Sequence, residues 1–218
     1  LSDYFADAMT RYPERFVGLA QVRENEAHTD AQIAELHRAA EELGMRGLYF
    51  QVGGFWVDSF RHGLDDSRLG VFWNQVDRLG LTVFWDFSVL PARSRDSYVE
   101  ELDGVIRVLE RHPNMRSVLV QAFPLSYFAP NGVYDLPAEA VVLAELPNFA
   151  AEVTLPISVG GRWDYPYQEM RLLVRQLYDT FGPNHLVWGS DMPNVLRFCT
   201  YRQSLDYLRR YCDFISAA

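Results

Sequence analysis

Short apolar runs alternate with longer amphipathic segments along the whole chain. Each run is rich in β-branched or aromatic residues and is too short for a globular helix, so each predicts a strand. The predicted strands lie at residues 16–20, 47–52, 81–85, 117–120, 149–153 and 186–188.

The segments between these runs have the period of a helix. Ile33, Leu36, Ala40 and Leu43, for example, form one apolar stripe, and Gly44 follows as a helix stop. Helices are predicted at residues 2–12, 31–44, 67–80, 96–112, 167–183 and 201–218. Because strand and helix alternate, the pattern predicts an α/β fold with parallel strands and crossover helices.

Such a repeat suits a doubly wound sheet or a (β/α)₈ TIM barrel. The sequence has neither the GxGxxG nor the P-loop pattern of the nucleotide-binding doubly wound folds, which favours the barrel. A full barrel needs eight strands, in about 250 residues. A chain of 218 residues with the six strands listed above therefore predicts part of a barrel, as one domain at 1–218.

Composition narrows the partners and the location. The chain is 49% hydrophobic, and 20 Lys and Arg stand against 29 Asp and Glu, a formal charge of −9. This charge disfavours nucleic acid and anionic membranes, so a small-molecule substrate is expected. Cys199 and Cys212 cannot form a disulfide framework, and neither a signal peptide nor a membrane-length apolar stretch is evident. These features predict a cytoplasmic protein.

Asp191 follows the apolar run at 186–188 through Gly189 and Ser190. A carboxylate at the end of a buried strand must be paired, bind a cation or have a shifted pKa, because an isolated charge is costly in a low dielectric. Asp191 is therefore a candidate functional residue, and a structural role in capping the following loop is the alternative.

Several motifs in order along the chain resemble the amidohydrolase-related (amidohydrolase 2) family. They include Tyr-Pro-Glu-Arg-Phe-Val-Gly-Leu-Ala at 12–20 and Trp-Gly-Ser-Asp-Met-Pro at 188–193, with shorter matches at 43–47, 64–66, 79–84 and 181–183. This family includes aminocarboxymuconate-semialdehyde and γ-resorcylate decarboxylases and several lactonases. The resemblance implies that the six strands are the third to eighth of a distorted barrel, and that the strand with the family's His-x-His element precedes Leu1.

The resemblance also implies roles for particular residues. Asp191 corresponds to the family's aspartate that ligates a divalent metal and acts as the acid or base beside the metal-bound water, so it is the best metal candidate here. The family's two further histidine ligands, at the ends of its fifth and sixth strands, are replaced by Asp86 and Gln121. The five histidines of the chain are expected to be surface or capping groups: His28, His37, His62, His112 and His185.

The cofactor therefore stays open between one divalent ion (Zn, Mn or Mg) and none. Oxygen groups of Asp86, Gln121 and Asp191 suit Mg²⁺ or Mn²⁺. Without a metal, Asp86 and Asp191 at one barrel mouth can divide acid and base duties, since neighbouring carboxylates move each other's pKa values apart. Alternatively, Asp86 pairs with loop backbone, Arg93 or Arg162.

The residues expected to contact the substrate lie at the predicted strand ends: Gln51, Trp85, Gln121, Arg162 and Trp163. Aromatic side chains in such places suggest a flat, conjugated or aromatic substrate, and they suggest equally a core that covers the barrel top. Arg162, in a glycine-containing loop, suits a clamp on a carboxylate or carbonyl.

Two classes of function follow. The first is a hydrolase of a lactone, ester or amide, or a non-oxidative decarboxylase of an aromatic or conjugated acid, with Asp191 as acid or base and Asp86 as its partner. The second is a non-catalytic barrel scaffold or binding protein that lost its metal ligands. A homo-oligomer is a further expectation, because the family commonly forms homodimers.

Overall fold

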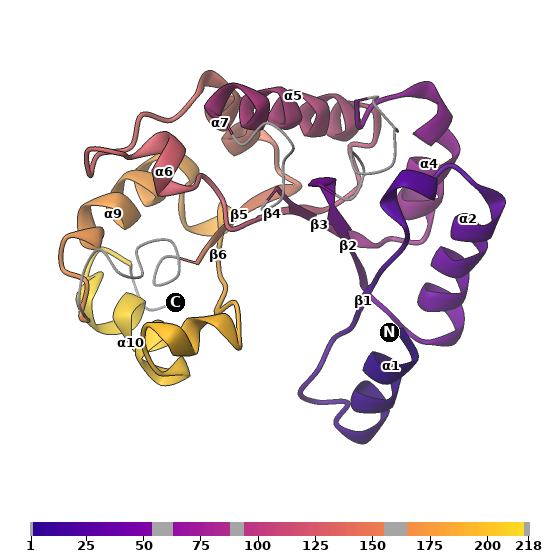
Figure 1. The fold of residues 1–218 in the computed structure, drawn as a ribbon, viewed down its shortest axis with the longest axis horizontal. Coiled ribbons are helices and arrows are strands. Elements are labelled where there is room, and N and C mark those ends of the chain that lie inside the picture. The colour runs from indigo at the N-terminus through magenta and orange to yellow at the C-terminus, as the bar shows by residue number, and fades with distance from the viewer. Residues whose placement is uncertain (1, 54–62, 88–93, 155–164, 216–218) are drawn as a thin grey trace. The chain divides into compact units, whose positions relative to one another are not determined.

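The computed structural model describes residues 2–53, 63–87, 94–154 and 165–215. They form two compact units, 1–118 and 119–218, called here the N-terminal unit and the C-terminal unit (Figure 1). The expectation of one domain over the whole chain stays a prediction.

All six predicted strands are present among the described residues. They are β1 (Leu19–Ala20), β2 (Gly47–Gln51), β3 (Thr82–Asp86), β4 (Ser117–Val120), β5 (Phe149–Val153) and β6 (Leu186–Trp188). Their order in the sheet is their order in the chain. The pairings of β1 with β2, β2 with β3 and β5 with β6 are parallel, as the alternation of strands and helices predicted.

The helices of the N-terminal unit begin and end close to the predicted positions. They are α1 (Ser2–Arg11), α2 (Asp30–His37), which continues as a π-helix (Arg38–Glu42), α4 (Gly70–Arg78), which follows a 3₁₀ turn (Ser67–Leu69), and α5 (Arg95–Arg111). Thr29 caps α2 by accepting a hydrogen bond from the Gln32 backbone, and Ser94 and Ser97 form a capping box at the start of α5. Gly44 follows the π-helix at a φ of +70°, a conformation that glycine adopts without strain.

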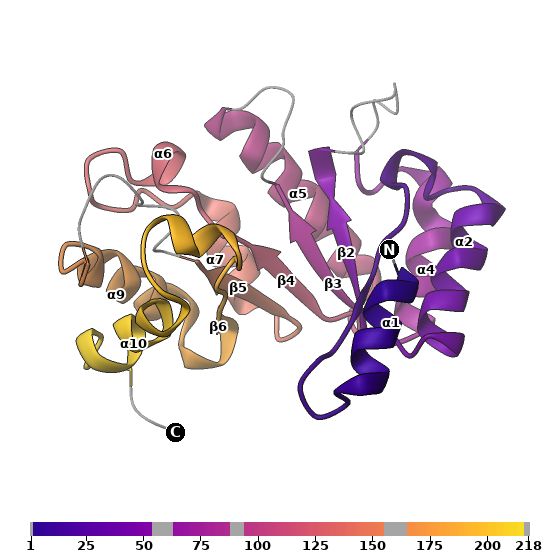
Figure 2. The same ribbon diagram turned by 60° about the horizontal axis from the view of Figure 1, so that its bottom comes forward.

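Aromatic side chains fill the core between β2, β3 and α4. The Trp73 ring of α4 lies 5.1 Å from the Phe50 ring and 5.2 Å from the Trp85 ring. The two indole N–H groups are satisfied, since Trp73 donates to the Leu64 carbonyl and Trp85 donates to the Ser117 hydroxyl at 2.6 Å. This core fixes which face of β2 and β3 is turned to the helices (Figure 2).

The opposite face of the same two strands carries polar groups. Side chains alternate between faces along a strand, so Tyr49 and Gln51 lie on the face away from Phe50. Gln51 is directly opposite Asp86 in the parallel register of β2 and β3. The register alone therefore brings a glutamine and an aspartate together at the carboxyl ends of two neighbouring strands.

The C-terminal unit contains α6 (Leu125–Phe128), α7 (Ala138–Glu145), α9 (Met170–Phe181) and α10 (Tyr201–Tyr211). The sequence predicted α9 and α10, whereas α7 was not expected. Its period is weak, because Val141 and Val142 are exposed although Ala140 and Leu143 are buried. Phe123, Phe149 and Phe181 form the aromatic core of this unit.

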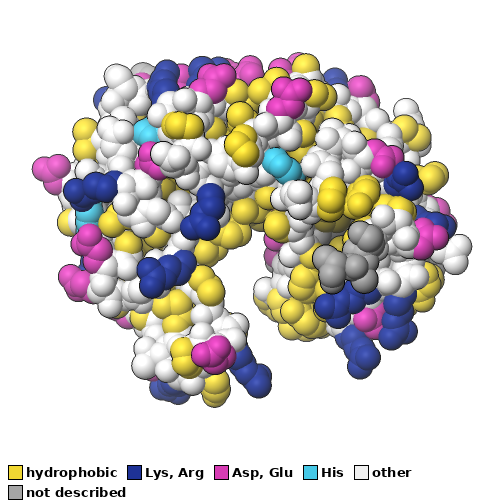
Figure 3. Space-filling view, turned by 180° about the vertical axis from the view of Figure 1, so that it is seen from behind, with side chains coloured by type: hydrophobic (Ala, Val, Ile, Leu, Met, Phe, Trp, Pro, Cys, Tyr) yellow, Lys and Arg dark blue, Asp and Glu magenta, His cyan; other side chains and the backbone are white. Residues whose placement is uncertain are grey.

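The surface gives no sign of a single charged patch on the face drawn in Figure 3, where basic and acidic side chains are interspersed. No helix in the described ranges is both long and apolar enough to cross a membrane.

Candidate active site

In the N-terminal unit, Asp86 is the centre of a buried hydrogen-bond network. Asp86 is the last residue of β3, and it is only 4% exposed. The Asp86 Oδ2 atom accepts hydrogen bonds from the Tyr49 hydroxyl and from Gln51 Nε2, the latter at 3.2 Å. Both of these donors are neutral groups, and they orient the carboxylate.

Glu24 joins this network from the loop beyond β1, where it begins a 3₁₀ helix (Glu24–Glu26). Its Oε1 atom accepts the backbone N–H of Gln51 at 3.1 Å. Burial raises the pKa of the Glu24 carboxyl, and the charge of Asp86 adds to this effect. The sequence interpretation missed Glu24. The available signal was an acidic residue shortly after a predicted strand.

In the C-terminal unit, Asp191 follows β6 and is half-buried. Its Oδ2 atom accepts a hydrogen bond from Gln121 Nε2 at 3.1 Å, and its Oδ1 atom accepts one from Asn194 Nδ2, also at 3.1 Å. Both oxygens are thus oriented by neutral amides, and neither donor supplies a positive charge.

Gln121 also holds a second carboxylate of this unit. Its backbone N–H donates to Glu152 Oε2 at 2.9 Å, so the one residue contacts both Glu152 and Asp191. Gln121 and Asp191 have φ values of +49° and +48°. Left-handed backbone is unfavourable for residues other than glycine, and where it persists it often marks a functional site.

The two units therefore repeat one arrangement. In each, a glutamine at a strand end donates its backbone N–H to a glutamate and its side-chain N–H to an aspartate. The N-terminal set is Glu24, Gln51 and Asp86, and the C-terminal set is Glu152, Gln121 and Asp191. Each set offers two carboxylates and an amide at the strand ends where TIM barrels carry their chemistry.

Because Gly189 has no side chain, the Glu152 side chain can occupy the space beside it. A Cβ atom built on Gly189 would lie 1.8 Å from Glu152 Oε1 and 2.3 Å from its carboxyl carbon. A side chain at position 189 would therefore have to displace the Glu152 side chain.

We expect Gly189→Ala to displace the Glu152 carboxylate and to lower the free energy of unfolding by about 1–3 kcal/mol, as overpacking usually does. Chemical denaturation measures this change. Gly70→Ala is the matched control, because a Cβ on Gly70 meets no atom within 4 Å. Equal stability of the two variants would contradict the packing described for Glu152.

The other site residues predicted from the sequence lie in the core, outside the described residues or in separate units. Trp85 is 0% exposed and packs in the core against Phe50 and Trp73, and its contact with a substrate stays a prediction. Arg162 and Trp163 lie outside the described residues, as does Arg93. Asp86 and Asp191 belong to different units, and their pairing at one rim stays a prediction.

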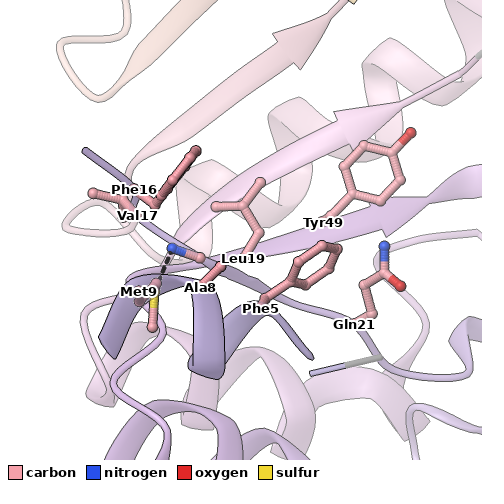
Figure 4. A pocket seen from close by; sticks show the side chains of 9 residues that line it. Phe5, Ala8, Met9, Phe16, Val17, Leu19, Gln21 and Tyr49 are labelled. Carbon is pink, nitrogen blue, oxygen red and sulfur yellow. Dashed lines mark hydrogen bonds between the residues drawn. The ribbon is translucent and has the colours of Figure 1, made fainter. Parts of the chain in front are cut away.

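An apolar pocket of about 330 Å³ lies beside β1 in the N-terminal unit (Figure 4). Its lining includes Phe5, Met9, Phe16, Leu19, Gln21 and Tyr49. Figure 4 shows the Tyr49 hydroxyl pointing away from the apolar side chains, in keeping with its hydrogen bond to Asp86. No carboxylate or imidazole is among the described residues that line this pocket, so it offers apolar contact and not acid–base chemistry.

The amidohydrolase family model matches residues 1–211. The chain therefore belongs to the amidohydrolase family, as its motifs indicated. It is an enzyme of the amidohydrolase superfamily. A comparison with curated proteins found no match.

Solved structures show the fold. An amidohydrolase from Burkholderia multivorans with bound zinc has a TM-score of 0.69 at 17% identity, over 100% of this chain and 72% of that one. A TIM-barrel protein from Bordetella bronchiseptica has a TM-score of 0.59 at 14% identity, over 98% and 70%. The 2,6-dihydroxybenzoate decarboxylase from Rhizobium has a TM-score of 0.57 at 17% identity, over 99% and 76%. The prediction of a partial TIM barrel is confirmed.

The residues of the two carboxylate sets do not fit a zinc site. Within the described ranges, no three His, Cys, Asp or Glu side chains are grouped as metal ligands. His37 and His112 are engaged elsewhere, in pairs with Glu41 and Asp77. The chemistry that these sets offer is that of carboxylates and neutral amides.

Proposed function

We propose that the protein hydrolyses a lactone, ester or amide of a small molecule, with Asp191 as its general base and acid. The observation that carries this proposal is the arrangement of Asp191, whose two oxygens are each oriented by a neutral amide, from Gln121 and Asn194. An anchored carboxylate without a cationic partner among these contacts can accept a proton, whereas a carboxylate paired with arginine is a weaker base.

The proposed reaction has two steps. The Asp191 carboxylate takes a proton from a water molecule while the water oxygen bonds to the carbonyl carbon of the substrate. The tetrahedral intermediate then breaks its bond to the leaving oxygen or nitrogen, and protonated Asp191 returns the proton to that leaving atom. Neutral donors such as the Gln121 amide hold the carboxylate in one orientation, which lowers the entropy cost of the proton transfer.

A second candidate is non-oxidative decarboxylation of an aromatic acid, and the similarity of fold to the Rhizobium 2,6-dihydroxybenzoate decarboxylase supports it. In this reaction protonated Asp191 delivers its proton to the ring carbon that carries the carboxylate. The bond to the carboxylate then breaks and carbon dioxide leaves. Both candidates need one carboxyl group that gives and takes a proton.

The test is a panel of aryl esters, five- and six-membered lactones, aryl amides and hydroxybenzoates, each incubated with the purified protein. Acid release in a weakly buffered solution reports hydrolysis, and chromatography of the phenol product reports decarboxylation. Parallel series with a chelator and with added Zn²⁺ or Mn²⁺ measure metal dependence. Turnover of an ester, lactone or amide supports the first candidate, turnover of a hydroxybenzoate supports the second, and no turnover of any compound contradicts both.

A further inference from the structure

We propose that Glu24 is a further catalytic residue, a general acid that gives its proton to an oxygen of the substrate. This inference rests on the proposed acid–base function, and it assigns a role to a side chain that the family's motifs do not include. The residues that support it all lie in the N-terminal unit.

The position of Glu24 is the first argument. The residue lies just beyond the carboxyl end of β1, and its neighbours Gln51 and Asp86 end β2 and β3. Side chains at this edge of a TIM barrel face the bound substrate. Glu24 is also held in place, because its Oε1 atom accepts the Gln51 backbone N–H and leaves Oε2 as the oxygen that can carry a proton.

The charges around Glu24 are the second argument. Asp86, on β3, is fixed as a hydrogen-bond acceptor by Tyr49 and Gln51. Arg23, which precedes Glu24 in the chain, forms an ion pair with Glu26 at 3.4 Å, and both of these side chains are exposed. Among the described residues, the charged side chain that acts on Glu24 from a packed element is that of Asp86, and a second carboxyl beside a fixed carboxylate tends to keep its proton. Burial is the largest cause that raises the pKa of Glu24, and the hydrogen bond from the Gln51 backbone acts against it.

The carboxyl groups of Asp86 and Glu24 have different roles in this proposal. Asp86 accepts hydrogen bonds from Tyr49 and Gln51, and Glu24 is the protonated partner in the proposed step. In the proposed step the Glu24 O–H bond breaks, the proton passes to the leaving oxygen of the substrate, and the electron pair of the broken carbon–oxygen bond stays on that oxygen. Glu24 is left as a carboxylate and is reprotonated by solvent. No oxidant or reductant is needed.

The first experiment is a carbon-13 NMR titration of the protein labelled at the glutamate side-chain carboxyl, with Glu24→Gln used to assign the Glu24 signal. We expect the midpoint of the Glu24 titration to lie above the ordinary glutamate value of about 4.3. We expect Asp86→Asn to lower it, because the neighbouring negative charge is removed. A midpoint at or below the ordinary value, or one that Asp86→Asn leaves unchanged, would overturn the proposal.

The second experiment is the pH profile of kcat/KM on a substrate found in the panel. A general acid must be protonated, so wild-type activity is expected to fall as pH rises through the Glu24 titration. Glu24→Gln is expected to lose about 10²-fold in kcat and to lack this alkaline limb. Glu26→Gln, a change in the same short helix, should keep the wild-type profile. A Glu24→Gln protein with wild-type kcat and profile would overturn the proposal for Glu24 and leave that for Asp191 intact.

The stability of Glu24→Gln separates catalysis from a structural role. A raised native pKa means that ionisation of Glu24 opposes folding, so stability is fully present below the unfolded pKa and is lost as pH rises through the folded pKa. We therefore expect Glu24→Gln to unfold at a higher temperature than wild type at pH 8, with the difference vanishing near pH 4. A variant less stable than wild type at pH 8 would mark Glu24 as structural. If the wild type turns over no substrate, the proposed function fails, and the NMR midpoint still decides whether Glu24 holds its proton.

Discussion

The Asp191→Asn protein is expected to lose about 10²- to 10⁴-fold in kcat on the substrate that the wild type turns over, which is the usual contribution of a general acid or base. Asparagine has nearly the same shape but cannot accept a proton at neutral pH. The two carboxylate oxygens of Asp191 accept hydrogen bonds from Gln121 and Asn194. In the variant, the asparagine NH₂ group replaces one of these oxygens, so it faces one of the two donors and that hydrogen bond is lost. Steady-state kinetics on the purified variant measures the loss.

The matched control is Asp179→Asn. Asp179 lies on α9, is 55% exposed in its side chain and pairs with Arg175 one turn away. Such a surface pair contributes little, so this variant should keep wild-type kcat and stability. An Asp191→Asn protein that retains kcat within about twofold would rule out Asp191 as the acid or base, because the smallest effect expected of that role is tens of times larger.

Trp85→Ala is expected to lower the free energy of unfolding by about 3–5 kcal/mol, the range for removing a large aromatic side chain from a core. The ring is 0% exposed and packs against Phe50 and Trp73. Its loss would also leave the buried Ser117 hydroxyl without the indole N–H that now contacts it. Denaturant unfolding followed by circular dichroism gives the value.

Two further variants test whether Trp85 acts through the core. Trp85→Phe keeps most of the ring volume and should lose much less stability than Trp85→Ala. Val71→Ala, on the exposed side of α4 at 58% exposure, should change stability by less than about 0.5 kcal/mol. A Trp85→Ala protein that keeps its stability but binds substrate more weakly would instead place Trp85 at the ligand.

The secondary structure was predictable wherever one face of an element is buried and the other is exposed. The strand at 47–52 and the helix at 96–112 have strong patterns, and they appear as β2 and α5 within a few residues of the expected bounds. The helix α7 carries valines toward solvent, so its pattern lacks the period that reveals a surface helix. Its position follows from packing against β5 and α9 and is not evident in its own residues.

The candidate site was predictable in part. Asp86, Gln51, Gln121 and Asp191 were chosen because they follow apolar runs, and each takes part in a hydrogen-bonded carboxylate set. Trp85 satisfies the same criterion and yet belongs to the core. Position at a strand end does not tell which face of the sheet a side chain occupies, and successive residues occupy opposite faces.

The sequence by itself determined that this protein is an α/β chain of the amidohydrolase family with an aspartate at the end of its last described strand. It could do so because hydrophobic period and local motifs are properties of neighbouring residues. The tertiary structure alone decided the partners: Glu24 meets Asp86 through Gln51, and Glu152 meets Asp191 through Gln121. Those contacts join residues far apart in the chain, and they depend on strand register and on the closeness that Gly189 permits, neither of which leaves a periodic signal.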